Sequence, residues 1–191
     1  MSVRPLVVLP DSRLFLCSEE VREEDFGDKI CSLVSDMFDT MYSSRGIGLA
    51  AVQIGVHKRL FVIDLHVNTR YKTSDGNTQD EGEYLSSCGP TVVINPEIIE
   101  RSGEMVVMEE GCLSVPRNKL ESVIRPKRVV MQYTDQDGKR KTIRAQGLLA
   151  RCLQHEIDHL DGVVFLKHLS KLKRDLVMAE MRKAAANSRH T

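Results

Sequence analysis

Two histidines separated by three residues stand near the C-terminal end of the chain. The run from Leu148 to Gly162 reads LLARCLQHEIDHLDG and contains His155 and His159, with Glu156 directly after the first histidine. On a helix, residues four apart lie on the same face one turn apart, so both imidazoles can bind one transition-metal ion. The glutamate can reach a water on that ion and accept its proton. The alternative interpretation is a pair of surface histidines on an amphipathic helix.

Such a metal site needs a third protein ligand, and a cysteine thiolate suits zinc or iron(II). Cys152 lies three residues before His155, but three ligands along one helix would strain the geometry. Cys112 follows Gly111 and comes shortly before Pro116, in a run that we expect to form an irregular, exposed turn at a strand end. The spacing favours Cys112 but does not decide between the two cysteines.

The elements that must position these residues are short strands and a few helices. We expect an amphipathic helix from Asp25 to Tyr42, capped by Asp25, and a last helix from about Leu169 to Ala186. Apolar runs predict strands at 59–65, 91–95, 97–101, 103–109, 119–124, 127–134 and 139–145. The sequence therefore predicts an α+β fold with short, mostly antiparallel strands around a buried metal-binding helix, and a helix near each end of the chain.

Length and composition are those of an ordinary globular domain. The 191 residues are 41% hydrophobic and 28% charged, and 27 Lys and Arg balance 27 Asp and Glu. This balance does not favour nucleic-acid binding through bulk charge, and no apolar run reaches the roughly 20 residues of a membrane span. Five scattered cysteines without a CxxC pair and the lack of a convincing signal peptide favour a cytoplasmic protein without disulfides.

We expect a single catalytic domain over residues 1–191. The polar, turn-rich stretch at about 66–89 is expected to be an inserted surface loop, and residues at about 187–191 a frayed tail. Gly46 and Gly48 flank Ile47 and suggest a backbone that turns sharply or lets another chain approach closely. No strand precedes these glycines and no Rossmann spacing follows them, so a dinucleotide site is not expected.

Three motifs, in order, resemble those of the peptide deformylase family. GIGLAAVQ at 46–53 matches the family's GxGLAAxQ, EGCLS at 110–114 matches its EGCLS, and QHEIDH at 154–159 matches its QHExDH. A weaker likeness runs through INPEI at 94–98 and RPKRV at 125–129, so the resemblance spans most of the chain. The main departure is the 66–89 loop, which leaves the motifs intact.

The resemblance implies a metallohydrolase that removes the formyl group from the N-terminal formyl-methionine of newly synthesised polypeptides. It implies one divalent ion, iron(II) by preference, with zinc, nickel or cobalt as substitutes. Glu156 would act as general base and then general acid while metal-activated water attacks the formyl carbon. The Gln53 amide and the Leu113 backbone N–H would stabilise the oxyanion. The ligands implied by the resemblance are Cys112, His155 and His159.

An extended substrate would pair with the backbone around Gly46 and Gly48 as an added strand. Its methionine side chain would enter an apolar pocket, and Glu110 could also orient a metal ligand. The full set of expected substrate-binding residues is Gly46, Ile47, Gly48, Met108, Glu110, Leu148 and Cys152.

Two other functions are compatible with parts of the sequence. A zinc peptidase of the HExxH type would draw its third ligand from a downstream residue, such as His168 or Glu180. A non-catalytic binder of nascent chains would normally have lost Glu156, Gln53 or a metal ligand, and all of these are present.

The last helix is basic and could contact the ribosome, although a solvated helix face is the simpler interpretation. No membrane contact and no sequence-specific nucleic-acid binding are expected. The basic residues concerned are Lys171, Lys173, Arg174, Arg182, Lys183 and Arg189.

Overall fold

The computed structural model describes residues 2–66, 84–115 and 119–187. Most of the expected loop at 66–89, Pro116 and nearly all of the expected tail therefore lie outside the described residues. The longer helices are α1 (Asp28–Ser43), α2 (Gly147–Leu160) and α3 (Lys171–Asn187). The strands are β1 (Gly48–Ala50), β2 (Leu60–Ile63), β3 (Thr91–Arg101), β4 (Met105–Glu110), β5 (Glu121–Pro126), β6 (Arg128–Thr134) and β7 (Arg140–Gln146).

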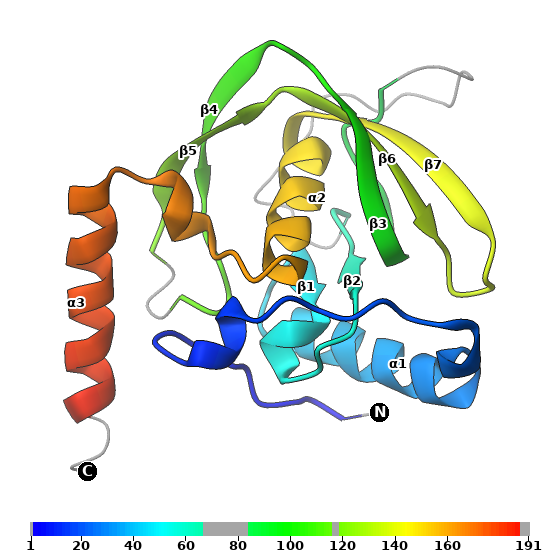
Figure 1. The fold of residues 1–191 in the computed structure, drawn as a ribbon, viewed down its shortest axis with the longest axis horizontal. Coiled ribbons are helices and arrows are strands. Elements are labelled where there is room, and N and C mark those ends of the chain that lie inside the picture. The colour runs from blue at the N-terminus through cyan, green and yellow to red at the C-terminus, as the bar shows by residue number, and fades with distance from the viewer. Residues whose placement is uncertain (1, 67–83, 116–118, 188–191) are drawn as a thin grey trace.

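Helix α2 lies at the centre of the molecule, between the β4–β5 pair on one side and β3, β6 and β7 on the other (Figure 1). Five strands form an antiparallel sheet in the order β1-β2-β3-β6-β7, and β4 pairs with β5 in a second antiparallel sheet. Every residue of α2 from Leu149 to Ile157 is buried. The expected α+β class, with antiparallel strands around a buried helix, is confirmed.

Strand β3 corrects the expectation of two separate strands at 91–95 and 97–101. The two runs form one strand that passes through Pro96. Because proline has no N–H to donate, the ladder with β6 shifts register between Ile94 and Glu97. Asn95 there has a positive φ of 48°, and its side chain accepts a hydrogen bond from the Val21 N–H at 2.9 Å.

Helix α1 begins three residues later than expected, and Asp25 does not cap it. Asp25 ends a short 3₁₀ turn and accepts hydrogen bonds from the Arg22 N–H and from Lys58 Nζ, both at 2.9 Å. Gly27, with φ of 103°, separates this turn from the helix, because that conformation cannot continue it. The helix then buries Met37 and its neighbours against β1 and β2, as the three- and four-residue spacing of its apolar residues predicts.

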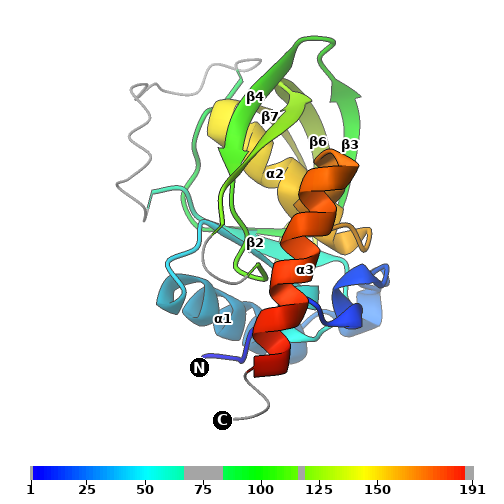
Figure 2. The same cartoon turned by 90° about the vertical axis from the view of Figure 1, so that its left-hand side faces the viewer.

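Helix α3 runs along the outside of the molecule beside the rest of the fold (Figure 2). It buries Val177 and Met181 in a cluster with Phe165, and it leaves Leu172 exposed. Ion pairs from Lys173 to Glu121 and from Lys119 to Glu180 tie it to the β5 end of the β4–β5 pair. Across the described residues, none of the helices has the length and apolar character needed to cross a membrane.

Candidate metal centre

The two histidines of α2 meet a cysteine that comes from a different part of the chain. Cys112 lies two residues after the end of β4, and its Sγ is 3.1 Å from Nε2 of His159. One ligand atom from each of Cys112, His155 and His159 lies within 4.8 Å of the others, and all three residues are buried. Within the described ranges, this is the only such cluster of potential metal ligands. The expectation of an exposed turn at Cys112 is wrong, because the turn packs against α2 and Ser114 and Val115 are buried with it.

The environments of the two candidate cysteines differ. Burial raises the pKa of the Cys112 thiol, but the neighbouring His159 and His155 outweigh this effect and lower it to about 5. Cys152 has its Sγ 3.9 Å from the Ile47 carbonyl oxygen, and burial raises its pKa well above 9.0. A metal ligand must be a thiolate, so the cluster suits Cys112, whereas Cys152 stays a neutral thiol.

A buried carboxylate orients one of the histidines. Glu110, the last residue of β4, has Oε2 at 3.1 Å from Nδ1 of His155. Arg125 donates from Nε to Oε1 at 2.6 Å and from Nη2 to Oε2 at 2.9 Å. Burial raises the pKa of Glu110, but its bonds to His155 and Arg125 reverse this and hold the pKa well below its usual range.. When Nδ1 carries the ring proton, the carboxylate accepts its hydrogen bond, which leaves Nε2 of His155 free to bind a metal ion.

Glu156 has the features of a general base. It is buried, and its Oε2 has no hydrogen-bond partner among the described residues. Burial raises the pKa of this carboxyl from 4.5 to about 7, although His155 and His159 oppose the rise. A buried oxygen without a partner suits a site that takes up a water molecule or a substrate group. A Cβ built at Gly48 would lie 2.9 Å from Cδ of Glu156. The lack of a side chain at this position therefore leaves room for the Glu156 carboxylate.

The Gln53 amide is held next to the cysteine. The 3₁₀ turn Ala51–Ile54 carries it, and its Oε1 accepts the Ala50 N–H at 2.8 Å. Its Nε2 donates to Ser114 Oγ at 3.1 Å and to Cys112 Sγ at 3.5 Å. Because Oε1 is held by the Ala50 N–H, Nε2 of the amide faces the segment that carries Cys112 and Ser114.

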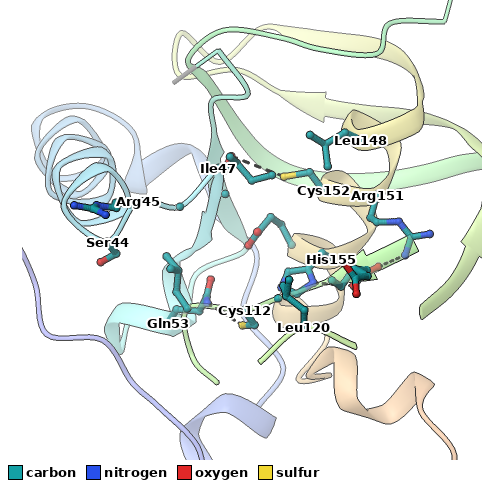
Figure 3. A pocket seen from close by; sticks show the side chains of 17 residues that line it. Ser44, Arg45, Ile47, Gln53, Cys112, Leu120, Leu148, Arg151, Cys152 and His155 are labelled. Atoms are coloured by element: carbon teal, nitrogen blue, oxygen red, sulfur yellow. Dashed lines mark hydrogen bonds and ion pairs between the residues drawn. The ribbon is translucent and has the colours of Figure 1, made fainter. Parts of the chain in front are cut away.

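A cavity of about 380 Å³ opens beside these groups. Figure 3 shows Gln53, Cys112 and His155 around its lower part, with Ile47, Cys152 and Leu148 around its upper part. Gly46, Gly48, Glu110, Leu113 and Glu156 also line it, whereas His159 lies beneath the surface with none of its area exposed.

Met108 is not brought into the cavity. It lies in β4 opposite Val123 and is only partly buried. Sequence reasoning missed Arg151, although its position three residues after Leu148 and four before His155 puts it on the same helix face. It also missed Leu120, which lies just before β5 and lines the cavity. No pattern in the sequence indicates that this residue reaches the cavity. The other lining residues not expected from sequence are Ser44, Arg45, Glu109 and Gly111.

Comparison with known proteins identifies this arrangement. The family model described as polypeptide deformylase matches residues 3–175. The chain belongs to the polypeptide deformylase family. Family membership and the converging Cys–His–His ligands together show that this is a site for a metal ion.

Individual deformylases are similar over nearly their whole length. The peptide deformylase of Wolbachia pipientis wMel is 46% identical over 183 residues, which are 96% of each chain. The crystal structure of peptide deformylase from Ehrlichia chaffeensis has a TM-score of 0.86 and 47% identity, and the match covers 98% of this chain and 99% of that one. The same enzyme in complex with actinonin gives a TM-score of 0.84 and 48% identity over 96% and 98% of the two chains.

Proposed function

We propose that this chain removes the formyl group from the N-terminal formyl-methionine of newly synthesised polypeptides. The observation that carries the proposal is the buried Cys112, His155 and His159 cluster with Glu156 beside it, at the edge of a cavity, in a member of the deformylase family. Acting on nascent chains would place the protein in the cytoplasm.

The three ligands fit a divalent ion of intermediate softness, because two imidazoles and one thiolate suit zinc, iron(II), nickel or cobalt. Iron(II) is the ion we favour. When bound, the ion supplies Lewis acidity, which lowers the pKa of a water molecule toward neutrality. Elemental analysis of anaerobically purified protein tests the choice of metal.

Glu156 moves the proton in this proposal. Its carboxylate accepts a proton from the attacking water and passes it to the amine that leaves when the C–N bond of the formamide breaks. Its raised pKa of about 7 suits both steps, because a group that titrates near the working pH can accept and release a proton readily.

Gln53 and Leu113 stabilise the charge that develops on the formyl oxygen. The Gln53 amide keeps its N–H groups on the side of Cys112, because its oxygen is fixed by the Ala50 N–H. The backbone N–H of Leu113, directly after the cysteine, is the second donor. Such donors are aimed before the reaction starts, so they need no reorganisation as the charge forms.

The substrate chain pairs with β1 in this proposal. β1 is at the end of the five-stranded sheet, so one of its edges has no partner strand in that sheet. An extended peptide can add there through backbone hydrogen bonds near Gly46 and Gly48. The methionine side chain then enters the cavity against the apolar parts of Ile47, Leu148 and Cys152.

The test is hydrolysis of formyl-Met-Ala-Ser by iron-loaded protein, followed through release of formate. Formate release with intact peptide bonds supports the proposal. A zinc peptidase would instead cleave a peptide bond, and its Cys112→Ala variant would keep metal and activity. Binding of formyl-Met-Ala-Ser without any turnover would indicate a non-catalytic binder of nascent chains.

Contact with the ribosome through α3 is a separate hypothesis. Its support is the exposure of Lys171, Arg182 and Lys183, although Lys173 on the same helix already pairs with Glu121. Replacing the three exposed residues by glutamate should abolish co-sedimentation with ribosomes if α3 makes this contact. Unchanged co-sedimentation would reject it.

A further inference from the structure

Arg151 is a charged residue in the middle of the buried helix, and the mechanism above gives it no role. Its side chain is only 4% exposed. It belongs to the face of α2 that also carries Leu148, Cys152 and His155, and it lines the cavity with them (Figure 3). Burial lowers the pKa of this guanidinium, although nearby Glu110 opposes the decrease. Removing the charge from water therefore costs free energy of folding.

The guanidinium connects α2 to both strands of the β4–β5 pair. Its Nη1 donates to Glu110 Oε1 at 2.5 Å and to the Val123 carbonyl oxygen at 3.0 Å. Its Nη2 donates to the Val106 carbonyl oxygen at 3.0 Å. Cys112 lies two residues after the end of β4, so this contact links the helix that carries the histidines to the segment that carries the cysteine.

The contact with Glu110 affects how that carboxylate meets His155. Oε1 accepts from both Arg151 and Arg125, and Oε2 faces Nδ1 of His155. Two guanidinium groups that donate to one carboxylate fix its rotation. A carboxylate held in this orientation meets Nδ1 of His155 and so directs Nε2 of that ring toward Cys112 and His159.

We propose that Arg151 is a positioning residue that raises the metal affinity of the centre through Glu110 and His155. Its aliphatic stem, which reaches the cavity from the same helix face as Leu148 and Cys152, forms part of the wall of the methionine pocket. The role of the stem in the pocket wall rests on the proposed deformylase function, whereas the effect of Arg151 on metal affinity does not.

Metal affinity is measured with cobalt(II) against a competing chelator, because the cobalt–thiolate absorption band reports binding by Cys112. Arg151→Met keeps an unbranched stem and removes the guanidinium, so we expect cobalt affinity to fall about 10- to 100-fold. Arg151→Lys keeps a charge that can reach Glu110 but cannot bridge both strands, and we expect an intermediate loss. Arg101→Met, at the exposed end of β3, is the matched control and should leave affinity unchanged.

A merely structural role would give a different result. In that case Arg151→Met would lower the melting temperature of the metal-free and cobalt-loaded proteins equally, so the stabilisation by cobalt would stay the same. The proposal requires that this stabilisation shrink. Cobalt affinity of Arg151→Met within twofold of the parent protein overturns it. If Arg151→Met does not fold, cobalt affinity of Arg151→Lys within twofold of the parent overturns it in the same way.

The pocket wall is tested with formyl-Met-Ala-Ser at saturating metal. Arg151→Met should keep KM within about threefold, because the methionine stem fills the same space, whereas Arg151→Ala should raise KM by opening the wall. Equal increases of KM in both variants overturn the role of the stem. If the parent protein shows no deformylation, the proposed function fails, while the cobalt measurements still decide the positioning role of Arg151.

Discussion

Adding one methyl group at Gly48 should disable the centre without touching a metal ligand. A Cβ at this position would overlap Oε1 of Glu156, its nearest neighbour, and would lie 2.9 Å from Cδ of Glu156 and 3.0 Å from Sγ of Cys152. Carbon atoms in contact prefer about 3.5–4.0 Å, so the Glu156 carboxyl must move by roughly 0.5–1 Å in Gly48→Ala. The backbone itself can accept alanine, because Gly48 is not among the residues with positive φ.

A displacement of about 1 Å in a catalytic group can reduce the rate about 10²-fold. We therefore expect kcat/KM of Gly48→Ala for formyl-Met-Ala-Ser to fall about 10²-fold, which is about 2.7 kcal/mol of transition-state stabilisation. Overpacking should also lower the free energy of unfolding by about 1–3 kcal/mol. Metal content should stay equal to that of the parent protein, because the three atoms nearest to the methyl group belong to Glu156 and Cys152, which are not among the proposed ligands.

Gly103→Ala is the matched control for this substitution. A Cβ there meets no atom within 4 Å, and its backbone φ is not positive. Both its kcat/KM and its melting temperature should equal those of the parent. Full activity of Gly48→Ala, with equal metal content, would show that the space at Gly48 does not position Glu156 and would refute the reasoning.

Three further predictions concern the groups around the proposed reaction. Glu156→Gln should lower kcat by about 10²–10⁴-fold while metal content is unchanged, and activity above a tenth of the parent's would exclude Glu156 as the proton carrier. Gln53→Ala should lower kcat by about 10²–10³-fold in the formate-release assay with melting temperature monitored alongside; an unchanged kcat would mean that the amide does not meet the oxyanion. The pH profile of kcat/KM should fall on the acid side, because Glu156 accepts a proton only when ionised and burial raises its pKa to about 7. A bound cation favours the carboxylate, so the midpoint should lie at or below pH 7, and a rate that rises on acidification would contradict this assignment.

Much of the secondary structure could be predicted because it depends on local patterns. The spacing of apolar residues gave α2 to within two residues at each end and the β6–β7 hairpin to within one. Strand β1 was not predicted, because its three residues are too few to show an alternating pattern. Two other errors lie where one residue overrides the pattern. Gly27 separated Asp25 from α1, and the bulge at Pro96 let two short runs continue as one strand.

Helical spacing predicted only the two histidines of the metal centre, and the family resemblance supplied Cys112 as the third ligand. His155 and His159 are one helical turn apart whatever surrounds the helix, so the sequence by itself determined that they share a face. The sequence also determined the family resemblance, because the motifs at 46–53 and 110–114 can be recognised without a structure.

Tertiary packing decided which cysteine meets the histidines. Cys112 and His159 are 47 residues apart in sequence, and only the placement of the β4 end against α2 brings Sγ to 3.1 Å from Nε2. Packing also placed Arg151 against Glu110 and left Met108 outside the cavity. Helical spacing is fixed by the local hydrogen bonds of one segment, whereas these contacts depend on how separate segments bury their apolar surfaces together, and no local pattern encodes that.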